Sequence, residues 1–140
     1  MERNPECIFC KIVAGEIPCL KIAETEKSIA ILDAFPLAPA HSLVISKRHA
    51  RDYFDMTQEE VDDAARLLKR VGEAAMKASG ATAVNLISNI GRPAGQVVMH
   101  AHLHAIPRFE NDRISITFDG SPQLSEAEKS SILESIKSFL

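Results

Sequence analysis

Three of the five histidines in this 140-residue chain occupy alternate positions in one short run, as His100, His102 and His104. Random placement would give only about 0.006 such runs in a chain of this length, so chance explains the pattern poorly. In an extended strand, alternate side chains project from the same face, and the apolar residues between the histidines would project from the other. We therefore predict that the apolar face packs in the core and that the three imidazoles face a cleft.

The chemistry open to such a run follows from the properties of imidazole. Imidazole can ligate a metal, and because it titrates near pH 6.5 it can also act as a nucleophile or proton donor toward an anionic substrate. Residues four apart on a strand are separated by about 13 Å, which is too far for His100 and His104 to share one ion. The spacing favours catalysis by the imidazoles themselves rather than by a bound metal. A run of hydrogen-bonded structural histidines is the remaining alternative.

The loop before the histidines contains residues that suit an anion. Gly91 and Gly95 permit backbone conformations in which amide groups point at a bound anion, and Gln96 adds a neutral donor. An ordinary turn is the alternative, because two glycines alone are a weak signal. The histidines that follow make anion binding the better interpretation.

The three cysteines, Cys7, Cys10 and Cys19, are an odd number and too few for a disulfide framework. The pair Cys7-x-x-Cys10 has three interpretations: a redox pair, half of a zinc site, or two buried thiols. A redox pair should follow a strand and open a helix. No strand precedes Cys7, so redox chemistry is the weakest of the three. A zinc site would require two more ligands from elsewhere in the chain.

The pattern of apolar residues predicts the elements that position these side chains. Thr57-x-x-Glu60 is a capping box that opens the longest helix, which continues with apolar residues at spacings of three and four until Gly80. A second capping box, Ser125-x-x-Glu128, opens a C-terminal helix. A short helix is predicted over 8–13 and strands over 20–24, 29–32, 42–46, 83–87 and 97–106, with 114–118 as a candidate sixth strand. Tight turns between strands, and helices that are grouped rather than alternating, indicate an α+β fold. We expect a mainly antiparallel five- to six-stranded sheet with one long helix packed on it and a C-terminal helix.

The composition excludes several classes of protein. The chain is 46% apolar and 25% charged with a net charge of −3, which fits one domain over residues 1–140 and argues against disorder and against a nucleic-acid partner. The short basic cluster Lys47-Arg48-His49 is interpreted as a solvated turn. No apolar stretch is long enough to span a membrane, and the N-terminus lacks the apolar core of a signal peptide. We therefore expect a soluble, cytoplasmic protein with no membrane partner.

The segment from Gly95 to Arg108 resembles the signature of the histidine triad (HIT) superfamily, in which histidines alternate with apolar residues. Upstream segments resemble the Hint branch, including bacterial members with an N-terminal Cys-x-x-Cys, in order and spacing: 7–12, 15–18, 32–33, 39–45 and 89–91. The resemblance covers a core of residues 5–108 and implies a HIT-like fold. The C-terminal extension, residues 109–140, carries no recognisable motif.

Hint proteins are nucleotide hydrolases and nucleotidyl transferases that act at the α-phosphate, typically of purine nucleoside phosphoramidates. The resemblance implies that His102 is the nucleophile, which forms a covalent nucleotidyl-histidine that water then hydrolyses. His104 and His41 would donate to the phosphate oxygens or the leaving group. His100 would orient His102 through its backbone carbonyl or its ring. This chemistry requires no metal, because imidazoles and loop amides supply the positive potential.

The resemblance also implies a purine nucleotide site. Asp33 is similar to the carboxylate that binds both ribose hydroxyls, although without the family match a turn residue at a strand end is an equal interpretation. The other matching positions are Phe9 and Ile31 beside the base, and Asn89, Gly95 and Gln96 beside the phosphate. The chain departs from the family pattern at Val97, where a hydroxyl often reaches the phosphate or leaving group. Only the backbone N–H remains as a donor there, which affects leaving-group preference and rate.

By the same resemblance, structural zinc would be held by Cys7, Cys10, His49 and His100. Two thiolates and two imidazoles form a closed tetrahedral set, which is structural rather than catalytic. Such a site would tie the N-terminus to the histidine run and fix the ring of His100. Two reduced buried thiols are the alternative, and Cys19 has no assigned partner.

Hint proteins are homodimers joined edge to edge through their sheets, so the resemblance implies a homodimer. We predict that residues 109–140 pack over the dimer and border the partner's cleft, because the C-terminal helix carries an amphipathic set of apolar residues, Ile132, Leu133, Ile136 and Phe139. Three other functions compete with a nucleotide phosphoramidase: a dinucleoside polyphosphate hydrolase, a nucleotide-binding adaptor with little catalysis, and a zinc-dependent hydrolase. A related transferase branch has glutamine at the position of His104, so the histidine favours water as the final acceptor.

Overall fold

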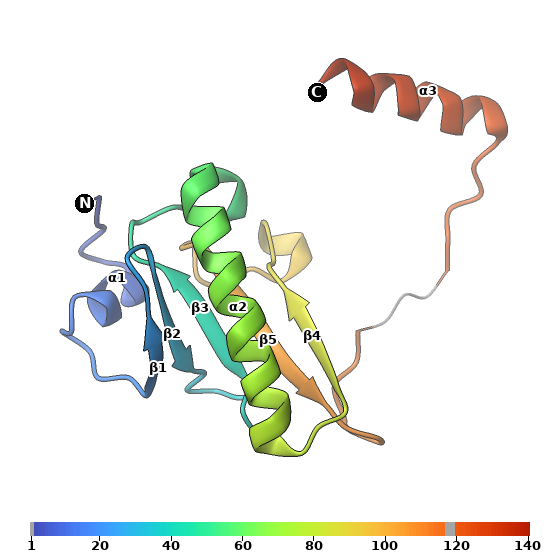
Figure 1. The fold of residues 1–140 in the computed structure, drawn as a ribbon. Helices are drawn as coiled ribbons and strands as arrows, with labels where there is room; N and C mark the ends of the chain where they lie inside the picture. Colours follow the sequence, from blue (N-terminus) through green and yellow to red (C-terminus); the bar gives the residue numbers. More distant parts are fainter. Residues whose placement is uncertain (1, 117–119) are drawn as a thin grey trace.

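A five-stranded antiparallel sheet carries His102 and His104 in the computed structural model, which describes residues 2–116 and 120–140 (Figure 1). The strands follow the spatial order β1-β2-β3-β5-β4. Their bounds are Lys21–Glu24 for β1, Ser28–Leu32 for β2, Ser42–Ser46 for β3, Ala83–Ile87 for β4 and His102–Arg108 for β5. Because β5 lies between β3 and β4, the histidines on it have a strand on either side.

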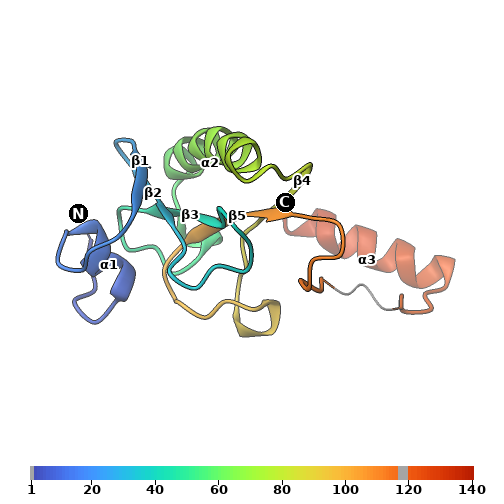
Figure 2. The same ribbon diagram turned by 90° about the horizontal axis from the view of Figure 1, so that it is seen from below.

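The long helix α2, Gln58–Ser79, covers one face of the sheet (Figure 2). Its N-terminus has the predicted capping box: the Thr57 hydroxyl accepts from the N–H of Glu60, and the Glu60 carboxylate accepts from the N–H of Thr57. Gly80 follows the helix with a φ of 76°, a left-handed conformation that favours glycine and ends the helix. The predicted start, end and packing of this helix are therefore confirmed.

Two apolar clusters form the core, one on each side of the sheet. The short helix α1, Ile8–Val13, and the loop between β4 and β5 lie on the side opposite α2 (Figure 2). The cluster on the α2 side includes Leu67, Leu68, Val71, Val44 and Leu103. The cluster on the α1 side consists of Phe9, Ile29, Ile31, Leu43 and Ile45. The predicted α+β class, with an antiparallel sheet, one long helix on it and a C-terminal helix, is confirmed.

The histidine strand is shorter than predicted, because β5 begins at His102 rather than at residue 97. Residues 98–100 form a bend in which the N–H of His100 donates to the carbonyl of Val98 at 2.9 Å. The N–H of Ala101 donates to the carbonyl of Ala50 at 2.7 Å. These bonds remove the segment from the strand ladder. The prediction that one strand carries all three histidines is therefore wrong for His100, whereas His102 and His104 lie on β5 and share one face.

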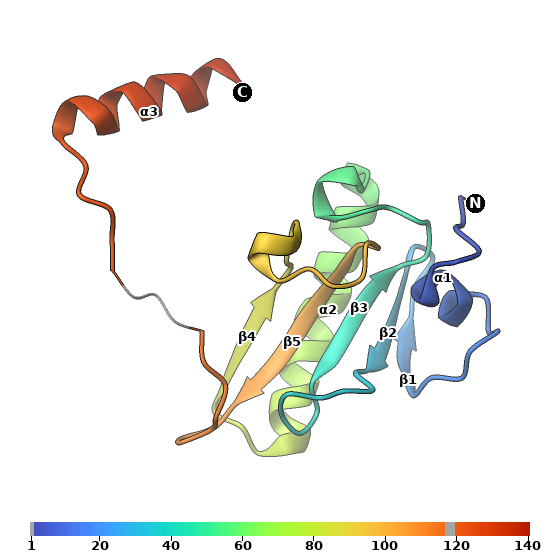
Figure 3. The same ribbon diagram turned by 180° about the vertical axis from the view of Figure 1, so that it is seen from behind.

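The C-terminal helix α3, Glu126–Ser138, begins at the predicted capping box. It lies apart from the sheet (Figures 1 and 3), and every residue from 120 to 140 is exposed. The predicted sixth strand over 114–118 is wrong over 114–116, which form no strand, and residues 117 and 118 lie outside the described residues. The backbone of Ile114 instead bonds to side chains, accepting from Arg108 at 2.8 Å and donating to Asp112 at 3.2 Å.

Within residues 2–116 and 120–140, no helix combines the length and the apolar character needed to cross a membrane.

The packing of α2 on the sheet predicts a large effect of shortening Leu67, whose residue is 1% exposed. We expect Leu67→Ala to lower the free energy of unfolding by about 2–5 kcal/mol, because it removes buried methyl groups and leaves a cavity. Arg66→Ala, on the exposed side of the same turn, should change it by no more than about 0.5 kcal/mol. Urea unfolding measures both, and equal losses in the two variants would contradict this packing.

Candidate active site and metal centre

His102 is oriented by the backbone of His100. The Nδ1 of His102 lies 2.6 Å from the carbonyl oxygen of His100. A carbonyl can only accept, so Nδ1 carries the ring proton and donates it, which leaves a lone pair on Nε2. The residue is 8% exposed, and the ring of Phe9 packs edge-on against it with ring centroids 5.0 Å apart. This arrangement makes Nε2 of a fixed imidazole available as a nucleophile.

His41 and His104 form a second hydrogen-bonded pair whose tautomers also follow from their partners. The N–H of Leu37 donates to Nδ1 of His41 at 3.0 Å, so the proton of the neutral His41 ring is on Nε2. That Nε2–H donates to Nδ1 of His104 at 2.9 Å. The proton of His104 is therefore on its own Nε2, where it can be donated to a substrate. Asp33 lies beside the pair, with Oδ2 3.4 Å from Nε2 of His41.

Burial keeps these imidazoles neutral at pH 7. It lowers the pKa of His102, and it lowers the pKa of His41 against the opposing effect of the Asp33 carboxylate. The pKa of His104 falls to about 4, first through burial and then through the neighbouring His102 and His41. A neutral imidazole retains the lone pair that a nucleophile needs.

A potential metal centre is formed by Cys7, Cys10, His49 and His100, whose ligand atoms all lie within 4.8 Å of one another. Cys7 Sγ is 3.3 Å from His100 Nδ1, Cys10 Sγ is 3.3 Å from His49 Nδ1, and the two Nδ1 atoms are 3.2 Å apart. Zinc bonded tetrahedrally to nitrogen and sulfur would separate its ligand atoms by about 3.3–3.8 Å. The expected ligand set is therefore brought together at a spacing that fits zinc.

The proton positions support a metal at this centre. His100 donates its Nε2–H to the carbonyl of Ser46 at 2.7 Å, so its Nδ1 presents a lone pair to the two thiols and to His49. At the His41–His104 pair, by contrast, a proton lies between the facing nitrogens. The Nδ1 of His100 is thus available to a metal, whereas Nδ1 of His104 already accepts the proton of His41. Two thiolates with two imidazoles is a donor set typical of structural zinc.

His100 links the metal centre to the candidate nucleophile. Its ring belongs to the metal centre, whereas its carbonyl accepts from His102. Of the two ways in which His100 was expected to orient His102, the structure has the one through the backbone carbonyl. A shift of the His100 backbone would therefore displace both a ligand of the metal centre and the acceptor that selects the tautomer of His102.

Two hollows meet at Asp33. One, of about 430 Å³, is lined by Asp33 and by residues 36–41, including His41. The other, of about 330 Å³, is lined mainly by apolar side chains, among them Ile8, Ile12, Ile17, Leu20 and Ile31. Asp33 itself is half-buried, and its Oδ1 accepts from the N–H of Phe35 at 2.9 Å. The expected ribose carboxylate thus lies where an apolar hollow adjoins the His41–His104 pair.

The loop between β4 and β5 is held by its own glutamine. The side chain of Gln96 is buried, accepts from the N–H of Gly91 at 2.9 Å and donates to the carbonyl of Arg51 at 2.8 Å. Gly95 has a φ of 98°, which favours glycine, and its carbonyl accepts from Asn89 at 3.5 Å. The residue Val97 is 88% exposed. The amide of Gln96, expected to be a free donor, is therefore engaged within the loop.

Several contacts that hold the site carry no signal in the sequence pattern. The acceptor for His100 is the backbone of Ser46, and the donor to His41 is the backbone of Leu37. Ser88 donates its hydroxyl to the carbonyl of His102 at 2.9 Å. Every residue has a backbone N–H or carbonyl, so residue types and spacing do not identify the ones that act here.

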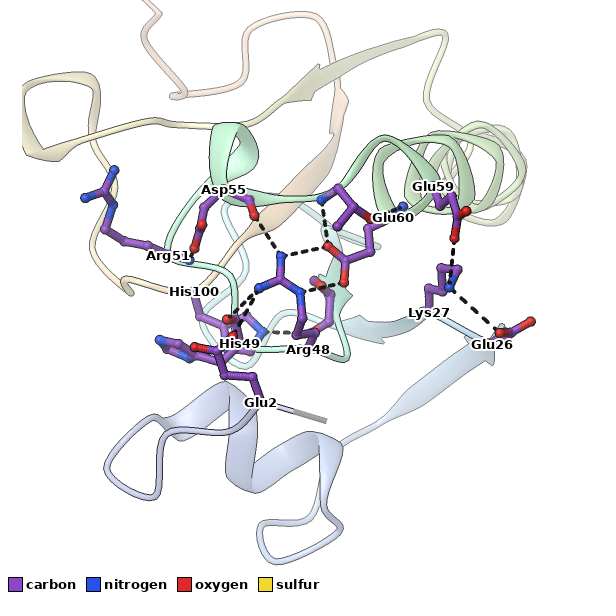
Figure 4. Close-up of polar contacts among 12 residues, drawn as sticks. Glu2, Glu26, Lys27, Arg48, His49, Arg51, Asp55, Glu59, Glu60 and His100 are labelled. Carbon is purple, nitrogen blue, oxygen red and sulfur yellow. Dashed lines mark hydrogen bonds and ion pairs between the residues drawn. The ribbon is translucent and has the colours of Figure 1, made fainter.

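The interpretation of Lys47-Arg48-His49 as a solvated turn is wrong for all three residues. The side chain of Lys47 is 18% exposed, and its Nζ pairs with Glu24 at 2.7 Å. His49 belongs to the metal centre, and Arg48 donates to both carboxylate oxygens of Glu60 at 2.8 and 2.9 Å (Figure 4). A signal for this pair was present in the capping box, because a Glu60 carboxylate that faces the core needs a cationic partner.

Comparison with known proteins identifies the family of this chain. The family model for the HIT domain matches residues 14–111. An adenosine 5′-monophosphoramidase of Schizosaccharomyces pombe is 46% identical over 102 residues, which are 73% of this chain and 74% of that protein. A HIT family protein from Bacillus anthracis superposes with a TM-score of 0.90 at 34% identity over 97% of this chain and 98% of that one. A zinc-bound histidine triad family protein from Mycobacterium smegmatis superposes with a TM-score of 0.74 at 34% identity over 96% and 98% of the two chains. The chain belongs to the HIT domain family.

Proposed function

We propose that this protein is a nucleotide hydrolase acting at the α-phosphate of purine nucleoside phosphoramidates or related nucleotides. The observation that carries the proposal is the hydrogen bond from Nδ1 of His102 to the carbonyl of His100, because it leaves a lone pair on Nε2 of a buried imidazole. The similarity to an adenosine 5′-monophosphoramidase supports the phosphoramidate as the substrate class. A dinucleoside polyphosphate hydrolase would use the same nucleophile and is the alternative.

In the proposed reaction, Nε2 of His102 attacks the α-phosphorus in line, and the bond from phosphorus to the leaving nitrogen breaks. His104, with its proton on Nε2, donates to a phosphate oxygen or to the departing amine, while His41 holds that tautomer from the other side. Once His104 has given its proton to the departing nitrogen, water attacks the phosphorus of the nucleotidyl-histidine and transfers a proton to Nε2 of His104, while the bond from phosphorus to Nε2 of His102 breaks. The products are the amine and the nucleotide, and all three imidazoles return to their starting tautomers.

No step of this reaction is assigned to a metal. Zinc at Cys7, Cys10, His49 and His100 would supply a structural cross-link, because these residues fill its four tetrahedral positions. Those residues would then fix the ring of His100, and the carbonyl of the same residue would orient His102. The metal centre would thus serve the geometry of the nucleophile rather than its chemistry.

The proposed nucleotide spans the two hollows that meet at Asp33. The ribose hydroxyls would donate to the Asp33 carboxylate, and the base would occupy the apolar hollow that Ile31 lines, near Phe9. The phosphate would lie against the loop whose matching positions are Asn89, Gly95, Gln96 and Val97. Because the side chain of Gln96 is bonded within the loop, we assign it the task of holding the loop in shape. The donors toward phosphate would then be backbone N–H groups, including that of Val97.

We further propose a homodimer in the cytoplasm. Strand β4 ends the sheet on one side and exposes Leu86, while α3 exposes the apolar side chains of Ile132, Leu133, Ile136 and Phe139. The superposition on the Bacillus anthracis protein covers 97% of this chain and so extends over α3. A detached amphipathic helix that keeps its place in a crystal structure of a relative suits contact with a second copy. Free thiols at a metal centre suit a reducing compartment.

The nucleophile assignment predicts the effect of removing the His102 ring. We expect His102→Ala to lower turnover of adenosine 5′-phosphoramidate by several orders of magnitude, because no other group can form the covalent intermediate. Release of AMP from the purified, zinc-loaded protein measures this. Leu67→Ala provides the matched control, because it perturbs the fold without touching the site and should retain turnover where it remains folded.

Two outcomes would contradict the proposal. Residual turnover of His102→Ala within about tenfold of wild type would remove the residue from the role of nucleophile. If the wild-type protein binds AMP but turns over neither the phosphoramidate nor a dinucleoside polyphosphate, the protein is a nucleotide-binding adaptor and not a hydrolase.

The neutral state of His104 predicts how stability depends on pH. Its pKa is about 4 in the folded protein against an ordinary value of 6.5, so the unfolded chain binds more protons between these values. The contribution of His104 to stability is complete above pH 6.5 and is lost as the pH falls toward 4. One such group changes the free energy of unfolding by at most about 1.4 kcal/mol per pH unit. We expect His104→Gln to show a smaller acid loss than wild type in urea unfolding, and equal losses would contradict the neutral assignment.

The dimer proposal predicts that α3 contributes to self-association. Ile136→Asp places a carboxylate on the apolar side of α3 and should shift the protein toward monomer in sedimentation velocity. Ser131→Asp adds the same charge on another side of the helix and should leave the association unchanged. A chain truncated at Glu110 that keeps both the wild-type association state and the wild-type substrate selectivity would contradict a role for the extension.

A further inference from the structure

Arg48 attaches the segment that carries a metal ligand to the N-terminus of α2 (Figure 4). Its Nε and Nη2 donate to the two carboxylate oxygens of Glu60 at 2.8 and 2.9 Å, and Nη2 also donates to the carbonyl of Asp55 at 2.7 Å. The side chain of Arg48 is 23% exposed and that of Glu60 is 10% exposed. A two-pronged contact of this kind fixes both the distance and the plane of the guanidinium.

The carboxylate of Glu60 is itself held by a firmly packed element. Its Oε2 accepts from the N–H of Thr57 at 2.8 Å, which completes the capping box, and it accepts one of the two bonds from Arg48. Helix α2 packs against β2, β3, β4 and β5. The guanidinium of Arg48 is therefore tied to an element that contacts most of the sheet.

The neighbours of Arg48 contact both histidines of the metal centre. His49 is itself one of the four ligands. The carbonyl of Ser46 accepts from Nε2–H of His100 at 2.7 Å, which turns Nδ1 of His100 toward the other ligand atoms. At the other end of the segment 46–50, the carbonyl of Ala50 accepts from the N–H of Ala101, also at 2.7 Å. This segment thus presents one ligand and orients another, and Arg48 is its side-chain link to α2.

The Arg48–Glu60 pair differs from the neighbouring Arg51–Asp52 pair in how far its cation is buried. Arg51 pairs with Asp52 at 2.9 Å, but the Arg51 side chain is 72% exposed, so water screens its charge. The Asp52 side chain is 6% exposed, but its carboxylate also accepts from the N–H groups of Phe54 and Asp55 and keeps these partners without Arg51. Removing one partner of the largely buried Arg48–Glu60 pair would leave the other charge poorly compensated. The segment would then relax away from α2, and the ligands that it holds would move with it.

We propose that Arg48 and Glu60 are positioning residues for the metal centre, which hold the segment 46–50 so that His49 and His100 are arranged for zinc before it binds. Groups that orient metal ligands typically change metal affinity by about 10–100-fold when removed. The proposal concerns metal affinity, so it stands or falls independently of the hydrolase activity proposed above.

The test compares zinc affinities of the full-length protein and its variants. Each protein is stripped of metal, and its affinity for zinc is measured at fixed pH by competition with a chromophoric chelator. We expect Arg48→Met and Glu60→Gln each to weaken zinc binding by about 10–100-fold. Glu60→Gln is the sharper variant, because glutamine can still accept from Thr57 and keep the capping box while losing the charge that faces Arg48.

Three further comparisons separate positioning from general stability. Arg51→Met removes a largely exposed guanidinium from the adjoining segment and should leave zinc affinity within about twofold of wild type. The double variant Arg48→Met with Glu60→Gln should bind zinc about as weakly as the weaker single variant, because the two side chains act as one unit. Arg48→Lys should recover only part of the affinity, because an ammonium cannot make the two-pronged contact.

Two results would overturn the proposal. If Glu60→Gln and Arg48→Met bind zinc as tightly as wild type while their metal-free and zinc-loaded forms lose equal thermal stability, the pair stabilises the fold and does not position the ligands. If Arg51→Met weakens zinc binding as much as they do, the effect reflects general loosening of the segment. Should Arg48→Met fail to fold without metal, Glu60→Gln still decides between these results.

Discussion

The site depends on one hydrogen bond, from Nδ1 of His102 to the carbonyl oxygen of His100 at 2.6 Å. That bond selects the tautomer in which Nε2 of a buried imidazole has a lone pair. The acceptor has its position because the chain bends before β5 and because the ring of His100 is held in the metal centre and by the carbonyl of Ser46. The metal ligands and the nucleophile are therefore connected through one residue, His100, although they lie in separate parts of the site.

The fold could be predicted from the sequence wherever local chemistry and packing agreed. The Thr57–Glu60 capping box and Gly80 marked both ends of α2, and the run from Ser42 to Ser46 was assigned as a strand with the observed bounds. The start of β5 was wrong because alternating polar and apolar residues continue through the bend at His100. An alternating pattern predicts which side chains are buried, but it does not indicate where the backbone stops pairing with the neighbouring strands.

The candidate site divides in the same way. Side chains with distinctive chemistry, such as the cysteines and histidines of the metal centre, were found from residue type and spacing through resemblance to a family, and the structure brings their ligand atoms together. Backbone partners such as the carbonyl of Ser46 and the N–H of Leu37 were invisible in the sequence, because any residue could supply them. Arg48 was assigned to solvent because its partner Glu60 lies twelve residues away on another element.

The tautomers of the site histidines test the central claim most directly. Nitrogen-15 NMR of the zinc-loaded protein at pH 7 distinguishes protonated from unprotonated ring nitrogens. We predict that His102 is neutral with its proton on Nδ1, and that His41 and His104 are neutral with their protons on Nε2. A proton on Nε2 of His102 at pH 7, in either the neutral or the charged ring, would contradict it, because the nucleophilic lone pair would then be absent.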